Sequence, residues 1–149
     1  MRESDRAAVR HRLEAELRNP VNVAVFSEPA SGLYVPGRRD CATCAETEQL
    51  MREVAELSDQ IKLEIHNVRE AADLASEWGI SGVPTVAIYS GTDSGVRFLG
   101  LPSGYEFLSF LETLISAGSG DGFGLQPESL DKLKSVDEDV EIKVFSTPT

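Results

Sequence analysis

The sequence is poor in cysteine, in positive charge and in long apolar runs. Only two of its 149 residues are cysteines, and 14 lysines and arginines stand against 25 aspartates and glutamates, so the formal net charge is -11 at pH 7. This excess of negative charge repels phosphate and argues against nucleic acids and anionic membranes as partners. No apolar run is long enough to cross a bilayer. Met1 to Asp5 lead into a charged segment, which indicates no signal peptide and makes the cytoplasm the expected compartment.

The two cysteines, Cys41 and Cys44, stand three positions apart. A reducing cytosol rarely keeps structural disulfides, so this pair is expected to be catalytic or metal-binding. A structural zinc site usually needs four Cys or His ligands, and only His11 and His66 remain, in separate segments. Zinc is therefore the less favoured interpretation, and we expect no metal or other cofactor. Buried or incidental cysteines are the plain alternative, because a Cys-x-x-Cys pair alone is only moderately specific.

Apolar periodicity predicts an α/β fold: a mixed four-stranded sheet flanked by helices, with a leading helix. Strands are expected at 21–26, 61–66, 85–89 and 96–99. Helices are expected from Asp5 to about Arg18, directly after the cysteines, from the Asn67 capping box to near Trp78, and from the Ser103 capping box to Gly118. The last of these helices is expected to bury Phe107, Leu108, Leu111, Leu114 and Ile115. Strand–helix–strand steps favour parallel pairing, and the late hairpin adds antiparallel strands.

The remaining segments suggest connections and a tail. Residues 27–40 form an expected loop, and the Gly-rich stretch 117–124 suggests a linker before a short helix at 127–134. Val140, Ile142 and Val144 alternate with charged residues, which is typical of one more strand, although a single strand has no core of its own. We therefore divide the chain into an N-terminal helix (1–19), one α/β unit (20–117), a linker with a short helix (118–139) and an orphan strand (140–149).

A cysteine pair between a strand and a helix has a clear chemical use. The first thiol lies near unpaired backbone N–H groups and the positive end of the helix dipole, which favours thiolate and lowers its pKa. Thiolate is the attacking species in disulfide exchange, so Cys41 is assigned as the nucleophile and Cys44 as the resolving thiol. Arg38 and Arg39 favour the thiolate while Asp40 opposes it, and the sign of their sum stays open. The intervening Ala-Thr pair leaves the direction of electron flow open as well.

The segment Ile80-Ser81-Gly82-Val83-Pro84-Thr85 resembles the cis-proline loop of the thioredoxin superfamily. The resemblance implies a cis bond before Pro84, at the start of a strand that faces the cysteine helix. It implies that Val83 offers its N–H and C=O to an extended substrate peptide, as an added strand would. Pro84 carries no N–H and is expected to exclude metal from the dithiol.

The stretches Glu53–Asp59 and Arg97–Leu108 are similar to the N-terminal unit of the glutaredoxin-like protein disulfide oxidoreductases of archaea and bacteria, which contain two thioredoxin-fold units. The resemblance runs from about Pro20 to the C-terminus. Gly100 is expected to let the backbone pass close to the cysteine loop. The chain departs from that family in its long 27–40 loop and in ending where the second unit's cysteines should begin. A shortened expression product, a natural one-unit product and a reading frame cut at a stop codon all stay open.

These patterns predict a thiol–disulfide oxidoreductase that acts on protein disulfides without a bound cofactor, its electrons coming from an external dithiol or a flavin reductase. Two alternatives stay open. The unit is an interaction module with slow or idle cysteines, or it is a relay that docks to a flavin reductase or peroxidase, like the N-terminal domain of flavin-dependent peroxidase reductases.

Overall fold

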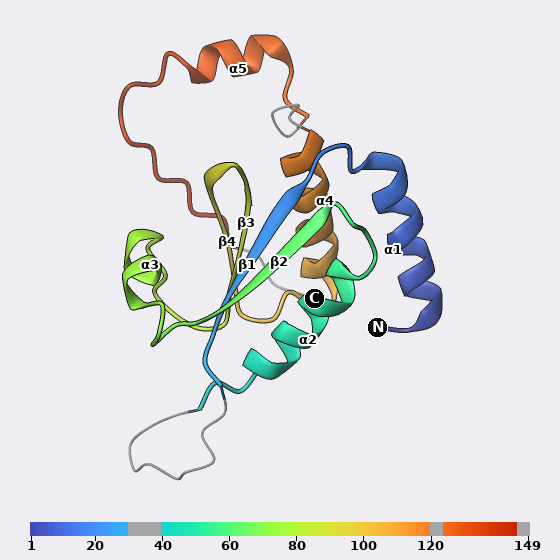
Figure 1. Cartoon of the computed structure of the whole chain (residues 1–149). Coiled ribbons are helices and arrows are strands. Elements are labelled where there is room, and N and C mark those ends of the chain that lie inside the picture. Colours follow the sequence, from blue (N-terminus) through green and yellow to red (C-terminus); the bar gives the residue numbers. More distant parts are fainter. Residues whose placement is uncertain (30–39, 120–123, 146–149) are drawn as a thin grey trace.

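A four-stranded mixed sheet with helices on both faces forms the centre of the computed structural model, which describes residues 1–29, 40–119 and 124–145 (Figure 1). The order across the described sheet is β2-β1-β3-β4. Its strands are β1 (Val21–Ser27), β2 (Ile61–Asn67), β3 (Thr85–Ser90) and β4 (Thr92–Leu99). β1 pairs parallel with β2 and antiparallel with β3, and β3 pairs antiparallel with β4. The mixed sheet predicted from the sequence is therefore confirmed.

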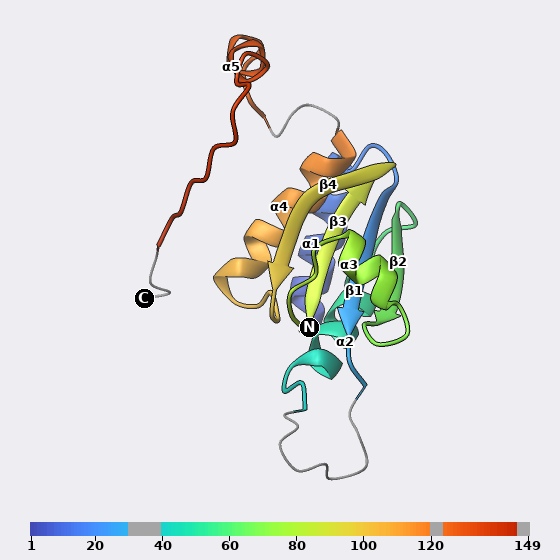
Figure 2. The same cartoon turned by 90° about the vertical axis from the view of Figure 1, so that its left-hand side faces the viewer.

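Three helices lie on one face of the sheet and one lies on the other (Figures 1 and 2). The first group is α1 (Glu3–Glu16), α2 (Cys44–Ala55) and α4 (Tyr105–Ser119), and the opposite face carries α3 (Ala72–Glu77). A fifth helix, α5 (Pro127–Leu133), starts with the expected proline, buries no residue and lies apart from the sheet.

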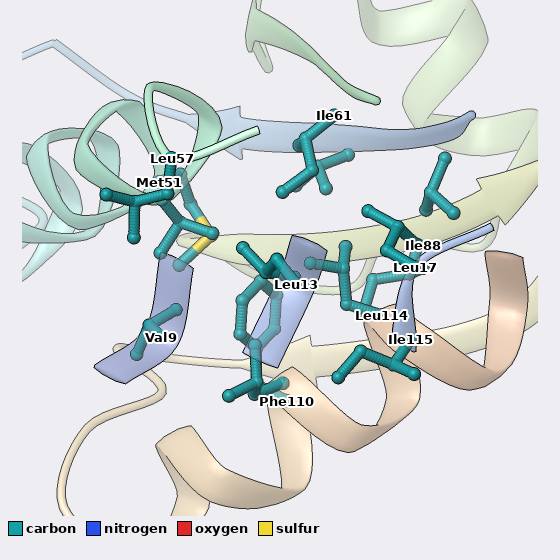
Figure 3. Packing of buried hydrophobic residues seen from close by; sticks show 14 of the residues in the cluster. Val9, Leu13, Leu17, Met51, Leu57, Ile61, Ile88, Phe110, Leu114 and Ile115 are labelled. Carbon is teal, nitrogen blue, oxygen red and sulfur yellow. The ribbon is translucent and has the colours of Figure 1, made fainter. Parts of the chain in front are cut away.

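The face under α1, α2 and α4 holds the larger core (Figure 3). Large side chains from the three helices and the sheet are under 2% exposed there, among them Leu13, Val23, Met51, Ile88, Phe110 and Leu114. Phe98 of β4 meets Phe110 edge to face, with ring centroids 5.6 Å apart. The β1 strand is almost fully buried because helices cover both of its faces, which is why it is a nearly continuous apolar run.

The α3 face holds a smaller core. Its buried residues are Ala24, Phe26, Ala75 and Ala87. Trp78 and Tyr89 close it from the side, with the Trp78 ring centroid 5.8 Å from that of Phe26 and 5.1 Å from that of Tyr89. Three of the four buried side chains are alanines, so each contributes little apolar area, and this face depends more on its aromatic edge.

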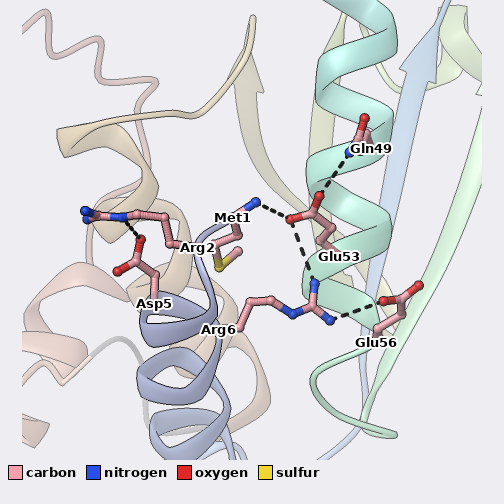
Figure 4. Close-up of polar contacts among 7 residues, drawn as sticks. All are labelled: Met1, Arg2, Asp5, Arg6, Gln49, Glu53 and Glu56. Carbon is pink, nitrogen blue, oxygen red and sulfur yellow. Dashed lines mark hydrogen bonds and ion pairs between the residues drawn. The ribbon is translucent and has the colours of Figure 1, made fainter.

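The leading helix packs on the larger core through Val9, Leu13 and Leu17. Polar contacts also tie it to α2: the Met1 ammonium lies 2.6 Å from Glu53, and Arg6 lies 3.4 Å from Glu56 (Figure 4). The hydrogen bond from the Met1 ammonium holds the pKa of the Glu53 carboxyl below its usual value. Exposed ion pairs of this kind contribute little, about 0–1 kcal/mol each, so the apolar stripe holds the helix in place.

Several boundaries differ from the sequence prediction for local reasons. α1 begins at Glu3, and Asp5 lies inside its first turn instead of capping it. The helix expected from Asn67 begins at Ala72, because Asn67 completes β2 and its Oδ1 accepts the N–H of Arg69 in a turn, at 3.1 Å. The second hairpin strand begins at Thr92 rather than 96, so the turn is shorter than expected.

Two expectations about α4 are also wrong. Leu108 is 54% exposed, because it lies on the solvent side of the helix. Gly118 does not stop the helix: it is a buried helical residue against the α1–β1 connection, and its carbonyl accepts a 2.7 Å hydrogen bond from the Asn19 amide. A Cβ at this position would lie 2.8 Å from Val21 Cγ2, so a tight approach between segments requires the glycine.

The expected C-terminal strand is not formed. Residues 140–145 have no strand assignment and pair with none of the described strands. Their apolar side chains are exposed, from 67% at Val140 to 91% at Phe145, so an alternating pattern without a neighbouring strand does not make a strand. The last four residues, and the parts of the expected loop and linker at 30–39 and 120–123, lie outside the described residues.

Candidate active site

The cysteine pair forms a disulfide at the start of α2. Cys41 and Cys44 are bonded, with their Cα atoms 5.5 Å apart. Cys44 is the first residue of α2 and is 2% exposed, whereas Cys41 precedes the helix and is partly exposed. Thr43, the N-cap residue, makes no side-chain capping bond, so the first-turn N–H groups stay directed at the cysteine loop. The exposed sulfur therefore lies at the positive end of the helix dipole.

The end of β1 is fastened to the first turns of α2. The Glu28 N–H donates to Cys44 Sγ at 3.4 Å, and the Ser27 hydroxyl donates to Glu48 Oε1 at 2.5 Å. Ser27 is 1% exposed, and Cys44 and Glu48 are one helical turn apart on the same face of α2. Two consecutive residues of the strand end thus hold two consecutive turns of the helix, which fixes the inner sulfur.

The loop that was expected to carry a cis-proline does so. The Val83–Pro84 bond is cis, and the Thr85 hydroxyl donates to the Gly82 carbonyl at 2.7 Å. Thr85 is opposite Phe26 in the antiparallel β1–β3 pair, so Pro84 lies at the sheet edge where β1 ends. The same edge carries the Glu28 contact to Cys44. The strand register therefore places the disulfide and the proline loop side by side.

Gly100 completes this edge. Leu99 pairs with Thr85, and the next N–H, that of Gly100, donates to the Pro84 carbonyl at 2.8 Å. Gly100 has φ of 95°, which favours glycine, but a Cβ there would meet no atom within 4 Å. The glycine is therefore explained by its backbone conformation and not by the close approach that the sequence suggested.

All five residues predicted from the sequence lie at one edge of the sheet, but several of their neighbours carry no signal in the sequence. The Ser27–Glu48 pair was missed, because no motif links the last residue of a strand to the second turn of a helix. Glu28 was also missed, and its side chain forms an ion pair with Arg69 at 2.5 Å. Arg38 and Arg39 lie outside the described residues. No group of three or more metal-ligating side chains occurs in the part of the chain that the structure describes.

A partly exposed sulfur at a helix start, a buried partner sulfur and a cis-proline beside them define the class: a thiol–disulfide oxidoreductase unit of the thioredoxin type. The family model of the thioredoxin domain matches residues 34–112, and the chain belongs to that family. None of the described helices is long and apolar enough to span a membrane.

Known proteins similar to this chain carry related names. A component of the alkyl hydroperoxide reductase of Escherichia coli (strain K12) is 29% identical over 109 residues, which cover 71% of this chain and 18% of that protein. A thioredoxin of Methanocaldococcus jannaschii is 36% identical over 64 residues, which cover 42% of this chain and 71% of that protein.

A solved protein disulfide oxidoreductase from Aeropyrum pernix has a TM-score of 0.73 and 33% identity, covering 90% of this chain and 54% of the other. This chain thus spans about half of the solved oxidoreductase and less than a fifth of the hydroperoxide reductase component.

Proposed function

We propose that this unit transfers two electrons between its dithiol and the disulfides of protein substrates, with Cys41 as the nucleophile and Cys44 as the resolving thiol. The observation that carries the proposal is the unequal exposure of the two sulfurs. Cys41 is open to an approaching disulfide, whereas Cys44 is 2% exposed and reachable only from Cys41. The support from known proteins is the thioredoxin domain match.

The exchange has two balanced steps. Cys41 thiolate attacks one substrate sulfur, forms a mixed disulfide and releases the other substrate sulfur as a thiolate, which takes a proton from water. Cys44 then loses its proton and attacks Cys41 Sγ, so that the Cys41–Cys44 bond forms and the mixed disulfide breaks. The substrate leaves with two thiols, and the unit is left in the oxidised state that the structure shows. The reverse sequence oxidises a substrate dithiol.

We propose that Val83, Pro84 and Gly100 line the substrate side of the site. Val83 precedes the cis-proline, and Pro84 opens β3 at the edge where the disulfide lies. An extended substrate would pair with the Val83 backbone as an added strand does, which aligns its sulfur with Cys41. Gly100 supports this arrangement through its hydrogen bond to the Pro84 carbonyl.

A relay role is the second candidate, and the similarity to a hydroperoxide reductase component favours it. In that case the partner is a flavin-dependent reductase or a peroxidase, and the chemistry at Cys41 and Cys44 is unchanged. We place either activity in the cytoplasm and in residues 20–117, with 118–139 as a linker. An interaction module with idle cysteines is the outcome that the experiment below must exclude.

The test is the capture of a mixed disulfide. Reduced Cys44→Ser chain is mixed with an eight-residue extended peptide that is disulfide-linked to a second copy of itself, and the adduct is measured by mass spectrometry. We expect stoichiometric adduct at Cys41, because nothing remains to resolve it. A Cys41→Ser control should form far less. Equal adduct in both variants would contradict the assignment of roles, and none in either would favour the idle module.

A further inference from the structure

Strand β4 and the residue that follows it hold both ends of the segment that leads into the cis-proline. Just past the strand, the Gly100 N–H donates to the Pro84 carbonyl at 2.8 Å. Within the strand, Arg97 Nη2 donates to the carbonyl of Trp78, the C-cap residue of α3, at 3.3 Å. Residues 79–84 therefore run between two anchors that lie three positions apart in the chain. The Arg97 anchor is a side chain, and so it can be changed without touching the backbone.

Arg97 is itself firmly placed. Its two terminal nitrogens form a fork with the Asp93 carboxylate, at 2.8 and 2.5 Å, and its side chain is only 16% exposed. Its guanidinium carbon lies 5.2 Å from the centroid of the Trp78 ring. Bidentate pairing and stacking on an aromatic face both need the planar guanidinium, which lysine does not supply.

A bulge in β4 makes this pairing possible. Residues four apart in a regular strand are separated by about 13 Å, too far for an ion pair. Between Ala87 and Tyr89 the β3–β4 register shifts, so that Ala87 is opposite Arg97 and Tyr89 is opposite Asp93. Bulges re-aim side chains in this way, and here the bulge turns Asp93 back toward Arg97. Because Arg97 is opposite Ala87, a residue of the α3-side core, its side chain lies on the α3 face.

We propose that Arg97 is a positioning residue for substrate exchange: it fixes the Trp78 end of the loop and thereby the backbone of Val83 beside the disulfide. The proposal rests on the function proposed above. Arg97 touches neither sulfur, so it is expected to affect substrates that pair with the loop backbone and to spare those that do not. Small misplacements of a positioned group cost large factors in rate, which gives the proposal a measurable size.

The test compares two disulfides in wild-type and Arg97→Gln chains. One is the disulfide-linked extended peptide described above, and the other is bis(2-hydroxyethyl) disulfide, which has no peptide backbone. We expect Arg97→Gln to lower the second-order rate constant for the peptide about tenfold and to leave that for the small disulfide within about twofold. Equal slowing of both, or of neither, would overturn the proposal.

Three further variants sharpen this result. Arg97→Lys keeps the charge without the fork and should not restore the peptide rate. Asp93→Asn leaves the arginine intact but removes its carboxylate partner, so its loss should be smaller, and it covers the case in which Arg97→Gln folds poorly. Arg12→Gln is the matched control, because Arg12 pairs with Glu16 and Glu112 on the opposite face of the sheet and should change neither rate. A loss with Arg12→Gln equal to that of Arg97→Gln would count against the proposal.

Amide hydrogen exchange tests the placement independently of activity. The Ile80 N–H is bonded to the Ala75 carbonyl and the Gly100 N–H to Pro84, and both should exchange faster in Arg97→Gln while the amides of β1 stay protected. Unchanged exchange at both positions would contradict the positioning role. A wild-type chain inert to both disulfides would instead contradict the proposed function, and the amide measurement would still decide the role of Arg97.

Discussion

The two faces of the sheet are stabilised by different kinds of contact. Under α1, α2 and α4, large aliphatic and aromatic side chains fill the space, with Phe110 and Leu114 fully buried. Under α3 the buried residues are mostly alanines, and the edge depends on Trp78 and on the polar contacts of Arg97. The sulfurs come from a helix of the densely packed face, whereas the loop with the cis-proline follows the helix of the thin face. Dense packing fixes the reactive atoms, and a few polar contacts fix the loop that meets the substrate.

Removing Phe110 should have the largest effect. Phe110→Ala deletes a fully buried ring that contacts both Phe98 and Phe107, so both transfer energy and a cavity term are lost. We expect the free energy of unfolding to fall by about 3–5 kcal/mol, measured by urea denaturation. Leu108→Ala is the matched control on the same helix, because Leu108 is 54% exposed and should cost far less. Similar losses for the two would contradict the account of a densely packed face.

Adding one methyl group to Gly118 tests the same face from the other direction. Its Cβ would lie 2.8 Å from Val21 Cγ2 and 2.9 Å from the Asn19 carbonyl oxygen, so one segment must shift. We expect Gly118→Ala to lower the unfolding free energy by about 1–3 kcal/mol, although alanine is otherwise the better helix former. A stabilised variant in urea denaturation would show that this approach is looser than described.

Trp78→Ala tests the thin face. The side chain is only partly buried, so we expect a loss of about 1–2 kcal/mol, well below that of a core aromatic residue. The larger consequence should be functional, because the ring supports the Arg97 guanidinium at the start of the loop. Exchange with the linked peptide should slow while exchange with bis(2-hydroxyethyl) disulfide does not. If stability falls as far as in Phe110→Ala, the contrast between the two faces is wrong.

The Asp93–Arg97 pair should give the smallest effect, a dependence of stability on pH. Hydrogen bonds from Arg97, and then from the Gly95 amide, hold the pKa of Asp93 below its ordinary value of 3.8. Its contribution to stability is therefore present above that value and is lost as the pH falls through the lower, folded-state pKa. Urea denaturation at pH values from about 5 down to about 2 should show part of the acid loss missing in Asp93→Asn. An unchanged acid loss in that variant would contradict the pairing.

Much of the fold followed from patterns that depend on neighbours in the sequence. The strands, the helix after the cysteines and the Pro84 loop were predicted because alternation, helical spacing and a short motif identify them. The prediction at Asn67 was wrong, since the same side chain can cap a helix or brace a turn, and the length of β2 decides between them. The strand at 140–145 was wrong because a strand needs a partner, which local alternation does not supply.

The site was predictable only where a motif named its residues. Cys41, Cys44, Val83, Pro84 and Gly100 were all placed at one edge, but Gly100 was expected there for the wrong reason. Ser27, Glu48 and Arg97 gave no signal, because their contacts join segments far apart in the sequence. The Asp93 fork of Arg97 also depends on a bulge, and no spacing in a regular strand would have paired the two residues.

The measurement closest to the central claim is the pH dependence of Cys41 alkylation by iodoacetamide in the reduced Cys44→Ser chain. Because this sulfur lies at the positive end of α2, its pKa in the folded chain should be below the value of about 8.5 for a free thiol, and should return to that value in urea. A folded-state midpoint at or above the urea value would show that the helix does not favour the thiolate, and the exchange mechanism would lose its basis.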